Sequence, residues 1–244
     1  MSSYSRQLLT LQKTIIRCDK CPRLVRWREE IAQEKVARFC TWKYWGKPVP
    51  SFGDPNARLL VVGLAPAAHG GNRTGRMFTG DRSGDWLYRA LHKFGFANQS
   101  ESVSSDDGLT LSDCYITASA RCAPPKNKLL PKELLNCRPY LLTELQLLKN
   151  VSVIIALGKV ACDTVYSAFK ELERTSLPKR PAFGHGKEYK LNGSQTLIAS
   201  FHPSQQNTFT GKLTEKMFDE VFWRAKQIID NSYSLWRRRK RKGS

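Results

Sequence analysis

The sequence predicts an α/β fold in which helices cover both faces of a four-stranded parallel sheet, as a three-layer α/β/α sandwich. Four short segments are apolar without interruption, as expected of strands that are buried on both faces. Segments with helical spacing of apolar residues separate these strands, and this alternation favours a parallel sheet. The length of 244 residues is enough for one domain with a sizeable core.

The elements follow in order along the chain. The expected strands lie at residues 58–64, 114–119, 152–157 and 196–201. The expected helices lie at residues 4–17, 85–94, 132–148, 158–172 and 212–230. In the second helix, Trp86, Leu87 and Leu91 share one face. Pro131 suits the first turn of the third helix. Residues 22–50 are basic and aromatic and give no clear assignment, whereas 98–112 and 174–190 are expected to be loops.

The charge of the chain favours a polyanionic partner. The formal net charge is +19, and nucleic acid is the simplest polyanion to match it. A separate basic run lies at residues 236–242, and we expect residues 236–244 to be a disordered tail that adds phosphate affinity. No apolar run reaches the roughly 18 residues of a membrane span, and the N-terminus does not resemble a secretory signal. We therefore expect a cytoplasmic protein associated with the nucleoid.

Two pairs of cysteines, far apart in the sequence, predict a site for a metal ion or a cluster. Cys18 and Cys21 have the spacing C-x2-C, and Cys122 and Cys137 have the spacing C-x14-C. Four thiolates suit either zinc or a [4Fe–4S] cluster, and the spacing does not choose between them. Such a site would fasten the N-terminal segment to the main fold, so we expect residues 1–235 to form one domain.

The loops that follow the four expected strands carry the glycine-rich and polar motifs of the chain. The first reads GLAPAAHGGNRTGRMFTGDRSG over residues 63–84 and matches neither nucleotide-binding glycine motif. The other three contain RCAPPKNK at 121–128, GK at 158–159 and FHPSQQN at 201–207. Because ligands bind beyond the carboxyl ends of strands in open parallel sheets, these loops predict a site.

Three side chains in these loops have functional and structural interpretations. Asp81 can activate water or stabilise a cation, or it can cap the helix that begins near Gly84. His202 can donate a hydrogen bond to a developing anion, or it can be a structural residue at a strand end. The amide of Asn127 can read the edge of a pyrimidine, or the residue can simply form a turn.

Taken together, these motifs resemble the uracil-DNA glycosylase superfamily, and most closely its iron–sulfur branch called family 5 or type B. The similar segments are GLAPA with HGGNRTGRMFTGD, the RCAPPKNK loop, the two cysteine pairs and HPSQQNTFTGKLT, which span roughly residues 15–225. The chain departs from the classical members and from family 4, because Leu64 and Ala65 stand where those proteins have an acidic group. The resemblance therefore implies that Asp81 supplies the carboxylate.

The resemblance also implies a [4Fe–4S] cluster and a role for each matched residue. The implied catalytic residues are Asp81 and His202. The implied substrate-binding residues are Gly63, Ala65, Ala67, Phe78 and Asn127. The implied DNA-binding residues are Arg73, Arg76, Pro203, Ser204, Asn207 and Lys212. The implied cluster ligands are Cys18, Cys21, Cys122 and Cys137.

The expected function is excision of uracil, and of other deaminated bases such as hypoxanthine, from double-stranded DNA. The enzyme would flip the nucleotide, hydrolyse the N-glycosidic bond and leave an abasic site. The matched motifs contain no lysine nucleophile, so we expect a monofunctional enzyme, and a monomer. The alternative is a non-catalytic iron–sulfur or zinc protein that binds nucleic acid, for which the charge and the four cysteines would also fit.

Overall fold

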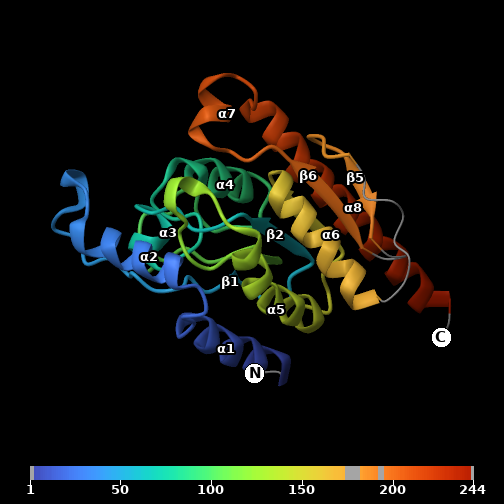
Figure 1. The fold of residues 1–244 in the computed structure, drawn as a ribbon. Helices are drawn as coiled ribbons and strands as arrows, with labels where there is room; N and C mark the ends of the chain where they lie inside the picture. The colour runs from blue at the N-terminus through green and yellow to red at the C-terminus, as the bar shows by residue number, and fades with distance from the viewer. Residues whose placement is uncertain (1–2, 174–181, 192–194, 243–244) are drawn as a thin grey trace.

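A six-stranded sheet forms the centre of the fold (Figure 1). Its strands lie in the order β1-β3-β2-β4-β6-β5. The structure is a computed structural model, and it describes residues 3–173, 182–191 and 195–242. The strands are β1 (Phe52–Gly53), β2 (Leu59–Gly63), β3 (Cys114–Ala118), β4 (Val153–Leu157), β5 (Glu188–Lys190) and β6 (Thr196–Ser200).

The four expected strands are confirmed as a parallel set, but the sheet has two further strands. β2 pairs in parallel with β3 and β4, and β4 pairs in parallel with β6. β1 and β5 add antiparallel edges, so the sheet of the described residues is mixed and has six strands, whereas four parallel strands were expected. These edge strands contain only 2 and 3 residues and are incompletely buried, so neither has the apolar run of a central strand.

Helices cover both faces of the sheet, as the α/β/α prediction requires. The helices are α1 (Ser3–Ile16), α2 (Pro22–Glu34), α3 (Gly71–Thr74), α4 (Arg82–Lys93), α5 (Pro131–Leu147), α6 (Lys159–Glu173), α7 (Gln205–Phe209) and α8 (Glu215–Lys242). Leu59 and Val61 of β2 point to the core formed with α4 and α8. Leu60 and Val62 point to the opposite core, formed with α1, α5 and α6. Successive side chains of this strand therefore pack into two separate cores, one on each face of the sheet.

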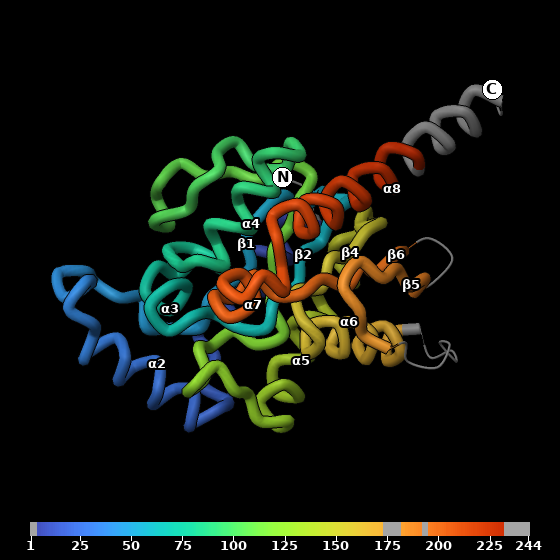
Figure 2. The backbone as a smooth tube through the Cα atoms, turned by 90° about the horizontal axis from the view of Figure 1, so that it is seen from above, coloured from blue at the N-terminus to red at the C-terminus, as the bar shows by residue number. Residues whose placement is uncertain are grey.

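The helices α2, α3 and α7 lie in segments that the sequence analysis left unassigned or as loops. Seen from above, α7 lies over the central strands, while α2 and α3 lie beside one another at one side of the molecule (Figure 2). The range of α8 includes residues 236–242, for which the sequence predicts a disordered tail. The chain contains no glycine or proline between residues 215 and 242, so nothing in this stretch interrupts a helix. No helix in the described part of the chain has both the length and the apolar character of a membrane span.

Candidate active site

A pocket of about 640 Å³ opens at the carboxyl ends of the parallel strands. Its lining residues are Leu64, Ala65, Pro66, Ala67, Met77, Phe78, Asp81, Arg82, Ser83, Pro124, Lys126, Asn127, His202, Ser204, Gln205 and Gln206. The pocket therefore brings together the loops that follow β2, β3 and β6. The loop after β4 does not line it but backs it, since a Cβ atom added at Gly158 would lie 3.5 Å from the Cβ of His202.

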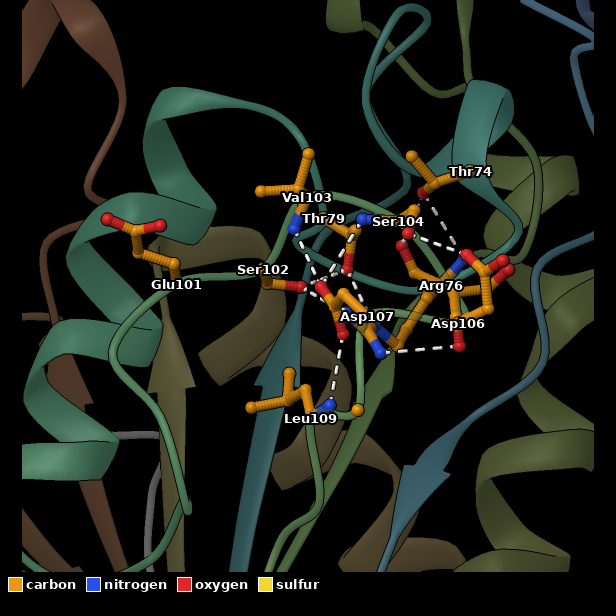
Figure 3. Close-up of polar contacts among 12 residues, drawn as sticks. Thr74, Arg76, Thr79, Glu101, Ser102, Val103, Ser104, Asp106, Asp107 and Leu109 are labelled. Carbon is orange, nitrogen blue, oxygen red and sulfur yellow. Dashed lines mark hydrogen bonds and ion pairs between the residues drawn. The ribbon is translucent and has the colours of Figure 1, made fainter.

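The segment before Asp81 is held by a buried polar network that the sequence analysis did not anticipate (Figure 3). The carboxylate of Asp107 accepts hydrogen bonds from Arg76 at 2.6 Å and from the backbone N–H of Val103 at 2.8 Å. Arg76 also donates to Thr79 Oγ1 at 3.0 Å and to Ser102 Oγ at 2.7 Å. The N–H of Gly80 donates to the carbonyl of Ser102 at 2.8 Å. The loop at 102–109 thus fixes residues 76–80.

Asp81 combines both interpretations that its sequence context left open. It is the N-cap of α4, and its Oδ1 accepts a hydrogen bond from the N–H of Gly84 at 3.0 Å. It also lines the pocket, while its Oδ2 lies against Gly70, where any added Cβ would collide with it. Burial raises the pKa of Asp81 to about 6, although hydrogen bonds from Gly84 and Ser83 and the charge of Arg73 act to lower it. The carboxylate is therefore ionised at neutral pH and close to its protonation point.

His202 and Phe78 form one wall of the pocket. Their rings are stacked, with centroids 6.2 Å apart and planes inclined by 30°. Burial lowers the pKa of His202 to about 4, so the imidazole is neutral and can donate one hydrogen bond. Phe78 has a positive φ of 55°, and its ring covers Gly63, where a Cβ would lie 2.6 Å from Cζ of Phe78. Gly63, expected to bind substrate, thus supports the ring and does not line the pocket.

The loop after β3 presents Asn127 through two consecutive left-handed residues. Lys126 has a φ of 52° and Asn127 a φ of 55°, and both residues line the pocket. Asparagine adopts this conformation more readily than most residues, whereas lysine does so at a cost. Such backbone strain is typical of functional sites, where surrounding structure enforces it.

The segment after His202 holds the expected DNA-contacting residues in different environments. Ser204 lines the pocket and caps α7, accepting a hydrogen bond from the N–H of Asn207. The side chain of Asn207 donates to the carbonyl of His202 at 2.9 Å, and Pro203 is buried, so both support the loop from inside. Lys212 is exposed, with its ammonium 5.0 Å from the ring centre of Phe201.

Phe209, at the end of α7, lies in the HPSQQNTFTGKLT segment, but the sequence analysis gave it no role of its own. Its side chain is 69% exposed, the largest fraction among the large exposed hydrophobic residues of the described chain. The guanidinium of Arg82, which lines the pocket, lies 4.8 Å from the centre of its ring. From this place the ring can contact a ligand that enters the pocket. The sequence could show it only once α7 and its position over the strand ends were known.

Arg73 and Arg76 are not on the surface, contrary to the expectation of DNA-contacting side chains. Arg76 is buried in the network with Asp107. Arg73 is 3% exposed and donates hydrogen bonds to the carbonyls of His69 and Gly80. Both guanidinium groups are therefore committed to protein partners, and neither is placed to contact a phosphate.

The cysteines of the predicted cluster site lie in segments that contact one another, and Cys18 is half-buried, with its carbonyl accepting a hydrogen bond from Arg28 of α2. Cys21 is the N-cap of α2 and contacts Cys122 through a small apolar cluster with Leu24. Cys137 lies on α5 and is buried, as are Cys21 and Cys122. Arg23 of α2 forms an ion pair with Glu133 of α5 at 2.7 Å, which holds the two helices together.

The surroundings of these thiols include hydrogen-bond donors, which suit sulfur atoms in the thiolate form. Arg28 donates a hydrogen bond to Cys122 Sγ at 3.0 Å, and Asn136 donates to Cys21 Sγ at 3.3 Å. Donors of this kind stabilise thiolate sulfur and tune iron–sulfur clusters. Within the described residues no three ligating side chains gather closely enough for one ion.

The comparisons with known proteins agree with this site. A family model described as the uracil DNA glycosylase superfamily matches residues 50–226. The chain is 50% identical over 216 residues to the type-5 uracil-DNA glycosylase of Thermus thermophilus, covering 88% of this chain and 95% of the relative. It is 49% identical over 212 residues to that of Mycobacterium tuberculosis, covering 86% and 78%. It is 46% identical over 211 residues to that of Pyrobaculum aerophilum, covering 86% and 88%.

The residues matched by the family model include all the loops that build the pocket. The fold agrees, since an α/β sheet flanked by helices carries the site at its strand ends. The chain belongs to the uracil DNA glycosylase superfamily and, within it, to the type-5 uracil-DNA glycosylases.

Proposed function

We propose that this protein excises uracil from DNA by hydrolysing the N-glycosidic bond, leaving an abasic site. The observation that carries the proposal is that Asp81, Asn127 and His202, three side chains with complementary chemistry, line the same pocket. The type-5 relatives, about half identical over most of the chain, support the same activity. The alternative of a non-catalytic nucleic-acid-binding protein is not favoured, because it gives no reason for these three residues to share a pocket.

The target base must leave the duplex before it can enter this pocket. Flipping a nucleotide costs a few kcal/mol, and an aromatic wedge can fill the space that it vacates. Phe209 suits this role because it is exposed and lies beside Arg82 at the pocket. Lys212, also exposed, suits a phosphate contact. We propose double-stranded DNA of the nucleoid as the substrate, and a monomer as the active form, since one chain supplies the whole pocket.

Inside the pocket, different residues recognise the base and assist cleavage of the glycosidic bond. The ring of Phe78 can stack on the base, and the Asn127 amide can donate to and accept from its edge. As the glycosidic bond breaks, positive charge develops on the sugar and negative charge on the departing base. Asp81 stabilises the sugar cation and orients the attacking water, for which it must be ionised.

His202 stabilises the departing base. Because its pKa is lowered to about 4 by burial, the imidazole is neutral at physiological pH. It therefore acts as a hydrogen-bond donor to the anionic base and not as a source of a proton, as neutral histidines do in other enzymes. Backbone N–H groups of Ala65 and Ala67, which line the pocket, can assist. Since no acidic side chain stands at Leu64 or Ala65, we also propose activity on other deaminated bases, including hypoxanthine.

We assign the four thiols at Cys18, Cys21, Cys122 and Cys137 to a [4Fe–4S] cluster. Bound there, the cluster would fasten α2 to the loop after β3 and to α5. Arg28 connects this region to the pocket loop. Its side chain donates a hydrogen bond to Cys122 Sγ at 3.0 Å, and its carbonyl accepts one from Asn72 of α3 at 3.1 Å. The cluster region and the pocket loop are thus joined by two hydrogen bonds through one residue.

The test is excision of uracil from a labelled U·G duplex by anaerobically purified protein, with alkali to cleave abasic sites. We expect product from the wild type and a loss of at least about 10²-fold with Asp81→Asn, the range typical of a general acid–base residue. Asp85→Asn is the matched control, since it removes an exposed carboxylate in the first turn of the same helix and should retain activity. Wild-type protein that binds the duplex tightly without excision would refute the enzymatic proposal.

A further inference from the structure

Arg73 is buried beside the proposed catalytic carboxylate in an unusual setting. Its guanidinium carbon lies 3.8 Å from the ring centre of Phe39 and 4.2 Å from that of Trp42. Its Nε donates to the carbonyl of His69 at 2.7 Å, and its Nη2 donates to the carbonyl of Gly80 at 3.2 Å. The guanidinium group thus links the two ends of the loop that carries Asp81.

The glycines of this loop are explained by the space that Arg73 and Asp81 occupy. Gly80 has a φ of +71°, and a Cβ added there would collide with Nη2 of Arg73. A Cβ added at Gly70 would collide with Oδ2 of Asp81. The carboxylate and the guanidinium group are therefore each packed against a glycine, and the packing leaves little freedom for Asp81 to move.

The aromatic clamp of Phe39 and Trp42 belongs to the segment at 37–46, which has no other evident role at the pocket. This segment is attached to α3 by backbone hydrogen bonds from Trp45 N–H to the carbonyl of Arg73 at 2.9 Å and from Gly46 N–H to the carbonyl of Asn72 at 3.0 Å. A guanidinium group between two rings gains cation–π attraction and is kept from water. The clamp therefore fixes Arg73 and strengthens its field on nearby charges.

We propose that Arg73 is a positioning residue for base excision, which holds Gly80 and Asp81 in place at the pocket from within its aromatic clamp. The proposal rests on the proposed role of Asp81 and replaces the expectation that Arg73 contacts DNA. Its charge adds a second effect. Arg73 is the cation that favours the ionised form of Asp81, Asp85 is the anion that opposes it, and the N–H groups of Gly84 and Ser83 donate to the carboxylate.

The test compares Arg73→Gln and Arg73→Lys with Arg89→Gln as a control. Arg89 of α4 pairs with Asp219 of α8 and does not line the pocket, so its variant measures the general effect of removing a partly buried arginine. We measure the single-turnover excision rate from pH 5 to 8, the dissociation constant of the duplex at several salt concentrations, and the melting temperature.

For Arg73→Gln we expect a rate lower by roughly 10²-fold, the scale of a misplaced catalytic group. The rise of activity with pH should move to higher pH, because loss of the cation makes Asp81 easier to protonate. Arg73→Lys keeps the charge, so its pH profile should stay near that of the wild type while its rate falls. Affinity for DNA and its salt dependence should be unchanged in both variants. A weaker complex with a salt slope smaller by about 1 would instead indicate a phosphate contact and overturn the proposal.

A second variant keeps the test decisive if the Arg73 variants fold poorly. Phe39→Leu opens one side of the clamp and leaves Arg73 intact, and it should lower the rate without weakening DNA binding. A wild-type rate in Phe39→Leu and in Arg73→Lys would overturn the proposal. Asp81→Asn distinguishes a failure of the role proposed for Arg73 from a failure of the role proposed for Asp81. If that variant is inactive while Arg73 variants behave as wild type, the positioning role fails and the proposed role of Asp81 stands.

Discussion

Asp81→Asn should make the protein more stable at neutral pH while abolishing its activity. The pKa of Asp81 is raised by burial from the ordinary 3.8 to about 6, so the folded protein holds this proton more tightly than the unfolded chain does. The ionised carboxylate of Asp81 therefore destabilises the folded protein, fully so above about pH 6, and this loss of stability disappears below about pH 4. The difference between the two pKa values corresponds to about 3 kcal/mol. Asparagine removes the charge but remains a good N-cap for α4.

The assay is unfolding of wild type and Asp81→Asn under anaerobic conditions at pH 7.5 and pH 4.5. We expect the variant to gain up to about 3 kcal/mol at pH 7.5, which is about 6–12 °C in melting temperature for a chain of this size. The gain should shrink at pH 4.5, where the wild type is protonated. Equal or lower stability of the variant at pH 7.5 would refute the reasoning.

Asp219→Asn is a control for which the expected change in stability has the opposite sign. The pKa of Asp219 is lowered although burial acts to raise it, because Arg89 and Lys93 donate hydrogen bonds to its carboxylate. The folded state therefore favours the ionised form, and stability is lost as pH falls through the lowered pKa. Removing this charge should destabilise the protein at pH 7.5.

Three further perturbations follow from the described contacts. Phe209→Ala should reduce excision from duplex DNA far more than excision from single strands, and a parallel loss on both substrates would argue against a wedge. Val103→Ala, which removes another exposed apolar side chain (53% exposed), should change neither rate. Glu144→Gln should lower the free energy of unfolding in urea by about 3–5 kcal/mol, because its partner Arg121, at 2.6 Å, would remain as an unpaired buried charge. Glu171→Gln, in a surface pair with Arg138, should lower it by less than about 1 kcal/mol. Gly70→Ala should lower the excision rate, because the added Cβ displaces Asp81. Gly95→Ala, whose added Cβ has no atom within 4 Å, should lower the stability of the protein and leave the rate unchanged. Excision kinetics and melting curves of both variants separate the two effects.

The parallel core of the fold could be predicted because its signal is local. The strands β2, β3, β4 and β6 are fully buried, and burial on both faces leaves an uninterrupted apolar run in the sequence. The edge strands β1 and β5 have no such signal, because their pairing is decided by neighbours distant in the chain. Helix α2 is similar: Arg28 reads as a solvent-exposed charge in the sequence but is buried between Cys122 and Asn72.

The pocket residues could be predicted from their loops, but the surroundings of each side chain could not. Asp81, Asn127 and His202 were indicated by strand-end position and by resemblance, and the pocket gathers all three. Arginine in a glycine-rich loop of a basic protein indicates phosphate contact, yet Arg73 and Arg76 turn inward. Their partners, Phe39 and Asp107, lie more than thirty residues away in sequence, so no local pattern connects them.

The short strands at the two edges of the sheet affect whether copies of the protein associate at high concentration. An open strand edge offers unpaired backbone groups to another chain and promotes aggregation. Here β1 offers only Phe52 and Gly53, with prolines at positions 50 and 55 on either side. β5 carries Glu188 and Lys190, and Glu188 is paired with Arg224 of α8 at 2.5 Å. Short, charged and proline-flanked edges disfavour strand pairing between copies, so many molecules can crowd along one DNA without joining their sheets.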